Sequence, residues 1–228
     1  MNADADADTG MSGDAAAGMG TAADANTGGS ADTDGGAGLV TDEPADADWP
    51  DISGDTALTI KVPEADPLVR AGFPAHVTVL YPFVHESRID AATHRELAGL
   101  FAGHDAFTLT FESFGRYPGV LYLDPWPHGP VTALTKDLTR RWPEAVPYRG
   151  IFGAGLAPHL TIANHEGPAT QEAAYDALQA ELAPALPLSC SVEAVQLIAW
   201  DGRRWQDRTA YRLGARRLTT RAAAPPDV

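Results

Sequence analysis

The chain has 228 residues, of which 31 are acidic and 16 are Lys or Arg, giving a formal net charge of −15. A single cysteine excludes an intrachain disulfide and a cysteine-based zinc site. The sequence has no apolar run of the roughly 18 residues that a membrane-spanning helix needs, so we expect no membrane association.

The negative charge is concentrated at the start of the chain. Residues 1–55 hold 13 acidic side chains and no Lys or Arg, which leaves 18 acidic against 16 basic side chains in 56–228. Residues 1–55 are rich in Ala, Asp and Gly and bury too little apolar surface to offset the entropy lost on folding. We predict a disordered acidic tail over 1–55, one folded domain over 56–215 and a flexible C-terminal tail over 216–228.

The folded part begins with alternating and β-branched residues that predict strands over 57–62 and 75–81. Asp90 is placed to cap a helix that continues to about residue 103. Strands are then expected over 107–114 and 119–125, joined by a turn in the sequence GRYPG.

The second half continues with a helix over 131–142, which a following proline ends. A strand over 158–164 and a helix over 169–183 come next. Residues 188–200 are long enough for one bent strand or two, and a last strand is expected over 209–214. The intervening segment DGRRWQD is interpreted as a turn or hairpin loop.

The order of elements after residue 76 is repeated after residue 159: strand, helix, strand, turn, strand. Such a repeat indicates a duplicated half-domain. We therefore predict an α+β fold with two pseudo-symmetric lobes of antiparallel-rich sheet, flanked by helices, around a central cleft.

Two short motifs occupy corresponding strands of these halves. Residues 74–83 read PAHVTVLYPF and residues 157–164 read APHLTIAN, each with His, an apolar residue, Thr and an apolar residue. Successive side chains of a strand point to opposite faces, so His76 and Thr78 share one face. The apolar residues between them seat the strand in the core, and the polar pair must face a cleft or find hydrogen-bond partners.

The same alternation puts His159 and Thr161 on one face of their strand. Two imidazoles on opposite sides of a cleft suit acid–base chemistry, because one can accept a proton while the other donates one. Two threonine hydroxyls can hydrogen-bond the oxygens of a phosphate. This chemistry requires no metal or cofactor. A metal site of His159 with His165 is an alternative, but no third ligand has suitable spacing.

HVTVLYPF and PHLTIAN resemble the paired HxTx motifs of the two-histidine (2H) phosphoesterase superfamily, in the branch called the 2'-5' RNA ligase family. The resemblance covers residues 57–214 in element order and motif spacing. It implies action on 2',3'-cyclic phosphates, related cyclic nucleotide phosphates or 2'-5' linkages. It implies proton transfer by His76 and His159, and phosphate binding by Thr78 and Thr161. The direction of reaction, hydrolysis or ligation, and the choice of acid and base stay open.

Other candidates lie near the motifs. Arg149, in the segment PYRGIFGAG, is a candidate phosphate contact because of its charge and its bidentate donors. Phe83 and Tyr148 are candidates for stacking on a base of the substrate. The ordinary alternatives are a solvent-exposed arginine and aromatic rings that pack against the core.

We expect the partner to be an RNA end or a small nucleotide with a cyclic phosphate. No DNA-binding motif or basic patch is present in the sequence, and a monomer is expected. With neither the basic nor the apolar region of a signal peptide at the N-terminus, a cytoplasmic location is expected. One alternative is a nucleotide-binding module without catalysis, and another is two strands whose polar side chains are satisfied locally.

Overall fold

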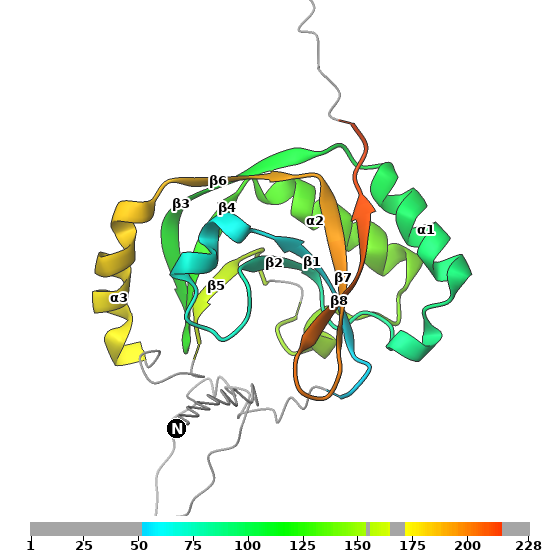
Figure 1. Ribbon diagram of the computed structural model, residues 1–228, viewed down its shortest axis with the longest axis horizontal. Coiled ribbons are helices and arrows are strands. Elements are labelled where there is room, and N and C mark those ends of the chain that lie inside the picture. The colour runs from blue at the N-terminus through cyan, green and yellow to red at the C-terminus, as the bar shows by residue number, and fades with distance from the viewer. Residues whose placement is uncertain (1–51, 154–155, 165–171, 216–228) are drawn as a thin grey trace, which may run out of the picture.

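The computed structural model describes residues 52–153, 156–164 and 172–215 (Figure 1). The predicted acidic N-terminal tail, except for its last residues, and the predicted C-terminal tail lie outside these ranges, so this division of the chain stays a prediction. In the described residues, no helix is both long enough and apolar enough to cross a membrane.

Two antiparallel sheets of four strands each form the frame of the described chain. The strands of the first sheet are β1 (Thr56–Lys61), β2 (His76–Leu80), β7 (Ala194–Trp200) and β8 (Trp205–Arg212). The strands of the second sheet are β3 (Phe107–Tyr117), β4 (Val120–Trp126), β5 (Leu160–Ala163) and β6 (Leu188–Val192). Their spatial orders are β2-β1-β7-β8 and β5-β4-β3-β6.

Helices flank both sheets, with α1 beside β8 and α3 beside β3 at opposite ends of the view in Figure 1. The α-helices are α1 (Ala91–Ala102), α2 (His128–Arg141) and α3 (Tyr175–Leu182). The short 3₁₀ helices are η1 (Pro63–Leu68), η2 (Glu86–Arg88), η3 (Pro147–Gly150), η4 (Glu172–Ala174) and η5 (Ala183–Ala185). Asp90 caps α1 as expected, because its Oδ1 accepts a hydrogen bond of 2.8 Å from the Thr93 amide.

The expected α+β fold with two lobes of antiparallel sheet is confirmed. The lobes are not contiguous halves of the chain, however. The first sheet combines strands from both ends of the chain, β1 and β2 with β7 and β8, while the second is built from the middle. The strands β6 and β7, separated by Glu193 alone, run from one sheet into the other.

A common core holds the sheets and helices together. The three α-helices contribute buried apolar side chains spaced three or four residues apart, as in an amphipathic helix. These are Leu97 and Phe101 of α1, Val131, Leu134 and Leu138 of α2, and Tyr175, Leu178 and Leu182 of α3. Phe101 stacks on Tyr211 of β8 with ring centroids 5.6 Å apart, which fixes α1 against the first sheet.

Strands β2 and β5 are both edge strands, and they lie side by side (Figure 1). The amide of Arg70, in the connection before β2, donates a hydrogen bond of 2.7 Å to the carbonyl of Ile162 in β5. The two strands that carry the motifs are therefore neighbours in space although they belong to different sheets.

Some boundaries differ from the sequence prediction. β3 continues to Tyr117, so the turn is confined to Pro118 and Gly119, and Gly119 has a φ of 73° that favours glycine. Residues 188–200 form two strands, which is one of the two predicted alternatives. β8 begins at Trp205, because the side chain of Asp201 accepts hydrogen bonds from the amides of Arg203 and Arg204 and closes a tighter turn than expected.

Helix α2 is tied directly to the motif strand. The Thr135 hydroxyl donates a hydrogen bond of 2.7 Å to the Val79 carbonyl of β2 and lies 3.1 Å from the Val131 carbonyl of its own helix. β2 is an edge strand, so α2 would otherwise cover the Val79 carbonyl without a hydrogen-bond partner. The Thr135 hydroxyl supplies that partner.

Replacing Thr135 with Val is expected to lower the free energy of unfolding by about 1–2 kcal/mol, since the covered Val79 carbonyl loses its partner. Urea denaturation measures this change. Thr139→Val is the matched control: its hydroxyl bonds only carbonyls of its own helix, and we expect a change within about 0.5 kcal/mol. Equal losses in both variants would contradict this role for Thr135.

Candidate active site

The first motif lies on β2 with the alternation that the sequence predicts. Val77 and Val79 are buried in the core, with 0% and 3% of their surface exposed. His76 and Thr78 are only partly buried and share the opposite face.

The second motif repeats this arrangement at β5. Leu160 and Ile162 are fully buried, whereas His159 and Thr161 are partly exposed. His159 immediately precedes the strand, and Thr161 pairs with Tyr122 of the neighbouring β4. We call His76, Thr78, His159 and Thr161 the motif residues.

The structure brings the two histidines close enough to influence each other. A positive charge on His159 lowers the pKa of His76. The side-by-side strands explain this proximity, because each presents its histidine at the start of β2 or just before β5.

Both imidazoles are oriented in the same way. His76 Nδ1 lies 2.9 Å from the Pro74 carbonyl oxygen, and His159 Nδ1 lies 3.0 Å from the Ala157 carbonyl oxygen. A carbonyl only accepts, so Nδ1 carries the proton in both rings. In the neutral ring Nε2 is therefore the basic nitrogen, and in the protonated ring it is the acidic one.

Burial lowers the pKa of both histidines below the ordinary 6.5. For His76 the hydrogen bond to Pro74 opposes this effect and the charge of His159 adds to it. For His159 the hydrogen bond to Ala157 opposes the effect of burial. In the free protein, burial therefore favours the neutral form of both rings, in which Nε2 carries no proton.

Two tyrosines that the sequence analysis did not single out pack on His159. The rings of Tyr117 and Tyr122 each have their centroids 5.5 Å from that of His159, edge to face. The two tyrosine rings stack on each other at 4.6 Å. Burial, followed by the hydrogen bond to Tyr122, raises the pKa of Tyr117 to about 12, so its hydroxyl stays protonated.

Gly115 makes room for this arrangement. It lies opposite Tyr122 in the β3–β4 pair, and a Cβ at Gly115 would stand 2.3 Å from Cζ of the Tyr122 ring. The ring therefore lies over the bare backbone of Gly115. The alternation of residues 119–125 predicts the strand that contains Tyr122. Because GRYPG was predicted to be a turn, Gly115 was not recognised as part of the strand that pairs with it.

His76 has different neighbours. Its ring packs on Phe73 with centroids 5.1 Å apart. Lys61 of β1 is its direct cross-strand partner, so the two side chains lie on the same face. The Lys61 ammonium pairs with the Asp207 carboxylate of β8. The sequence analysis did not identify Lys61 as a neighbour of His76, because the pairing of strands cannot be deduced from the local sequence.

Arg149 and Tyr148 lie in η3, beside the end of β2. The Arg149 guanidinium forms an ion pair of 2.9 Å with Asp55, whose carboxylate is largely buried. Tyr148 is tied to the residue that follows β2, because its amide donates a hydrogen bond of 2.6 Å to the Tyr81 carbonyl. The phosphate contact of Arg149 and the base stacking of Tyr148 stay predictions.

Phe83 has the position of a core residue. Only 6% of its surface is exposed, and its ring packs edge to face on Trp142 with centroids 5.2 Å apart. This position fits the packing alternative, since a ring that is covered by the core offers little face to a base.

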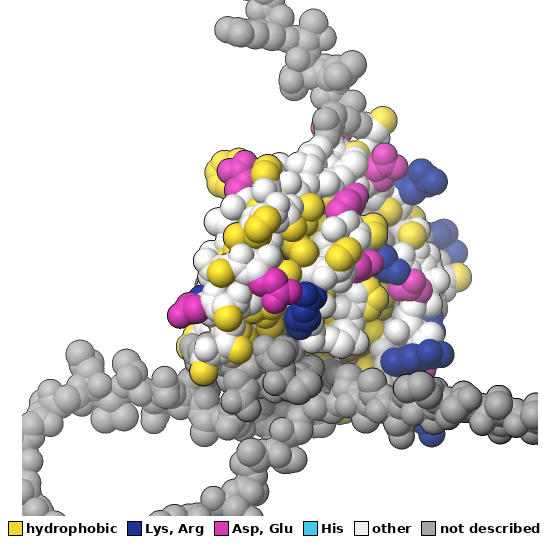
Figure 2. Space-filling model, turned by 60° about the vertical axis from the view of Figure 1, so that its left-hand side comes forward, with side chains coloured by type: hydrophobic (Ala, Val, Ile, Leu, Met, Phe, Trp, Pro, Cys, Tyr) yellow, Lys and Arg dark blue, Asp and Glu magenta, His cyan; other side chains and the backbone are white. Residues whose placement is uncertain are grey.

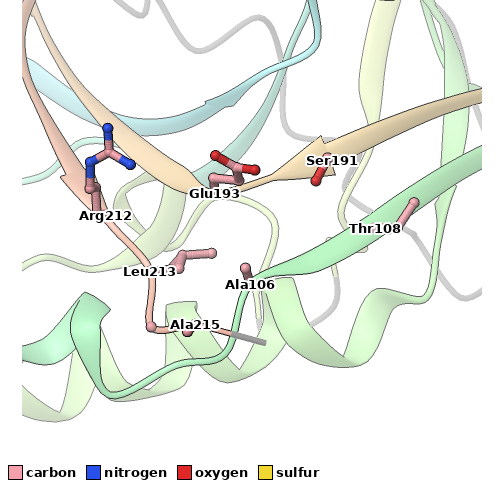
Figure 3. Close-up of a pocket in the computed structure, with 8 residues that line it drawn as sticks. Ala106, Thr108, Ser191, Glu193, Arg212, Leu213 and Ala215 are labelled. Atoms are coloured by element: carbon pink, nitrogen blue, oxygen red, sulfur yellow. The ribbon is translucent and has the colours of Figure 1, made fainter. Parts of the chain in front are cut away.

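In the described part of the chain, the motif residues belong neither to a group that could hold a metal ion nor to the surface hollow of Figure 3. The described residues contain no group of three His, Cys, Asp or Glu side chains that could hold a metal ion, and His165 lies outside them. A hollow of about 510 Å³ lies where β3, β6 and β8 meet, lined by Thr108, Glu193 and Arg212 among others (Figure 3). None of the motif residues lines it.

Charges of both signs lie on the face that Figure 2 shows. On that face, Lys and Arg side chains are interspersed with Asp and Glu (Figure 2).

Residues 55–204 match the 2'-5' RNA ligase superfamily. Among solved structures, the chain is similar to E. coli LigT complexed with 3'-AMP, with 18% identity, a TM-score of 0.46 and coverage of 71% of this chain and 99% of LigT. TT0787 of Thermus thermophilus has 16% identity, a TM-score of 0.49 and coverage of 71% and 98%. LigT complexed with NADP+ has 19% identity, a TM-score of 0.45 and coverage of 71% and 98%. No curated protein matches.

Stability should depend on pH through the two histidines. Their folded-state pKa values lie below the unfolded value of about 6.5, so the unfolded chain binds more protons as the pH falls through this region. We expect the free energy of unfolding to fall between about pH 7.5 and about pH 5.5. Urea denaturation at both values should show a smaller fall for His76→Gln/His159→Gln. An equal fall in that variant would contradict the assignment.

Gly115→Ala should lower the free energy of unfolding by about 1–3 kcal/mol, because its Cβ forces the Tyr122 ring out of place. In a Tyr122→Ala background the same change should cost little. Gly99→Ala in α1, where an added Cβ meets nothing within 4 Å, is the control and should be stabilising by about 0.5–1 kcal/mol. Thermal or urea denaturation distinguishes these outcomes, and equal costs in both backgrounds would rule out the clash.

Proposed function

The chain belongs to the 2'-5' RNA ligase superfamily, and from this premise we propose that it is a phosphoesterase whose proton carriers are His76 and His159. The proposed substrate is a 2',3'-cyclic phosphate or a 2'-5' linkage at an RNA end or in a small nucleotide. The observation that supports this most is the matched orientation of the two rings, each with Nδ1 held by a backbone carbonyl and Nε2 left for the reaction.

In the proposed hydrolysis of a cyclic phosphate, one histidine accepts a proton from water through Nε2. The water oxygen bonds to phosphorus, and the bond from phosphorus to one ribose oxygen breaks. The other histidine donates the proton that this ribose oxygen needs, leaving a phosphate monoester and a free hydroxyl. Ligation would follow the same path with the 5'-hydroxyl of a second RNA end in place of water, so that a bond from phosphorus to the 5' oxygen forms as the bond to one ribose oxygen breaks.

The proposed path needs one neutral and one protonated ring. Mutual repulsion disfavours protonation of both rings, in line with the lowering effect of His159 on the pKa of His76. An anionic phosphate between the rings would raise the pKa of the nearer one and supply the missing proton carrier. No metal ion is needed for this proton transfer.

The threonines are proposed to bind the phosphate itself. Thr78 shares a face with His76, and Thr161 shares one with His159. Each hydroxyl can donate one hydrogen bond to a non-bridging oxygen, where negative charge grows in the transition state. Because both threonines are fixed on strands, their positions cost no reordering when the substrate binds.

Further parts of the function stay predictions. A monomer in the cytoplasm is expected from the sequence. Arg149 would add a phosphate contact only by moving from Asp55, with which it is paired. A nucleotide-binding module without catalysis remains the alternative that the activity test must separate from an enzyme.

The test is hydrolysis of nucleoside 2',3'-cyclic phosphates by the full chain in EDTA. His76→Ala and His159→Ala are each expected to lower kcat by about 10²–10⁴-fold, because each removes one proton carrier. Thr78→Ala and Thr161→Ala should each lower it by about 10²-fold.

His94→Ala is the matched control, since this histidine lies on α1 and bonds the Tyr211 hydroxyl at 2.7 Å. It should retain the activity of the unaltered chain. Full activity in either His76→Ala or His159→Ala, with an intact fold, would refute the two-histidine mechanism. Nucleotide binding without turnover across cyclic phosphates and 2'-5' oligonucleotides would favour the binding module.

A further inference from the structure

The face of the first sheet that carries His76 and Thr78 continues beyond the motif strand. Thr78 is opposite Thr59 of β1, and Thr59 is in turn opposite Gln196 of β7, so these three side chains share one face. Side chains two positions apart in a strand point the same way, which puts Ala194 on that face together with Gln196. We call this surface the motif face of the first sheet.

Arg212 of β8 lies on the motif face at the far edge of the sheet. Its cross-strand partner is Ala194 of β7, whose side chain points the same way. When the pairing of β1 with β7 is continued by two residues, Ala194 is level with Lys61, the cross-strand partner of His76. Arg212 is therefore three strands across from His76, about 14 Å along the sheet at an inter-strand spacing of about 4.8 Å.

The second sheet has a corresponding face. Tyr122, whose ring packs on the second histidine, alternates with buried residues of β4 and shares its face with Trp126. Trp126 is opposite Thr110 of β3, which points the same way as Thr108, and Thr108 is opposite Ser191 of β6. Thr108 and Ser191 therefore lie on the same face of the second sheet as Tyr122.

The hollow of about 510 Å³ lies where these two faces come together (Figure 3). Thr108 and Ser191 line it from the second sheet, Arg212 lines it from the first, and Glu193 lines it from the junction of β6 and β7. The strands β2 and β5, which carry the motifs, are at one edge of the two sheets, and β8 and β6 are at the other. The motif residues and the hollow therefore lie on the same faces of the sheets, at opposite edges.

The side chains around the hollow match the chemistry of a nucleobase. Glu193 and Arg212 are exposed, and neither forms an ion pair with another residue in the described ranges of the chain. The carboxylate accepts hydrogen bonds, the guanidinium donates them, and the hydroxyls of Thr108 and Ser191 can do either. The edges of a nucleobase carry both donors and acceptors, whereas a phosphate would be repelled by Glu193. The hollow therefore suits a base better than a second phosphate.

We propose that the hollow is a subsite for the second nucleoside of an RNA strand whose terminal cyclic phosphate lies between His76 and His159. The two places are about 14 Å apart along the sheet, so the nucleotide that carries the reacting phosphate does not fill both, and the next one reaches the hollow. Lys61 lies on the motif face beside the path of the connecting phosphate, and its ammonium is paired with Asp207. This inference rests on the proposed function and narrows its substrate from a mononucleotide to an RNA end.

The test compares a nucleoside 2',3'-cyclic phosphate with a trinucleotide that ends in the same cyclic phosphate, both with the full chain. We expect KM to be about 3- to 10-fold lower for the trinucleotide at similar kcat. The gain falls on KM because the added contacts lie away from the reacting phosphate and are equal in the ground state and the transition state. Equal KM values for the two substrates would overturn the inference.

Arg212→Gln and Glu193→Gln locate the subsite. Each should raise KM for the trinucleotide by about 3- to 10-fold more than KM for the mononucleotide, because only the trinucleotide occupies the hollow. Arg95→Gln is the matched control: it removes the same charge from the exposed surface of α1, which packs through Phe101 on Tyr211, on the opposite face of the first sheet. It should alter neither KM. Equal effects of Arg212→Gln on both substrates, or equal effects of Arg212→Gln and Arg95→Gln on the trinucleotide, would overturn the inference.

The comparison also distinguishes this inference from the proposed function. If His76→Ala and His159→Ala lose activity and the length of the substrate has no effect, the two-histidine function stands and the subsite falls. If the chain turns over neither substrate, binding of the trinucleotide is measured by calorimetry. Weaker binding by Arg212→Gln than by Arg95→Gln would keep the subsite alone, and equal binding would overturn it. Absence of trinucleotide binding would overturn both.

Discussion

The contact between the edge strands β2 and β5 is the constraint on which the candidate site depends. A strand shows only every second side chain to one face, so each strand can offer a His–Thr pair while its apolar residues hold it in the core. The hydrogen bond from the Arg70 amide to the Ile162 carbonyl ties the connection before β2 to β5. The contact keeps the two pairs side by side although their strands belong to different sheets.

The two halves of the site agree in backbone geometry and differ in their surroundings. In both histidines, Nδ1–H donates a hydrogen bond to the carbonyl oxygen of the residue two positions earlier. The stacked rings of Tyr117 and Tyr122 pack against His159. The ring of His76 packs instead on Phe73, and Lys61 is its cross-strand neighbour. A symmetric pair of motifs thus acquires unequal environments, which is what an acid and a base with different tasks require.

Much of the fold followed from local patterns. The alternation around His76 and His159, the Asp90 cap and the apolar spacing of the helices each depend on residues within a few positions of one another. Local patterns say less where a partner from elsewhere in the chain sets the surroundings. Phe83, a candidate for base stacking, packs on Trp142 from just beyond α2, as in the packing alternative.

The sequence by itself determined which residues are proposed for the chemistry and which face of each strand they occupy, because side-chain direction in a strand follows from the backbone alone. Only the tertiary structure decided what surrounds them: Tyr122 over Gly115 beside His159, and Lys61 across from His76. These contacts join residues of different strands and loops, and the energy that selects them comes from packing and pairing over long separations in the chain.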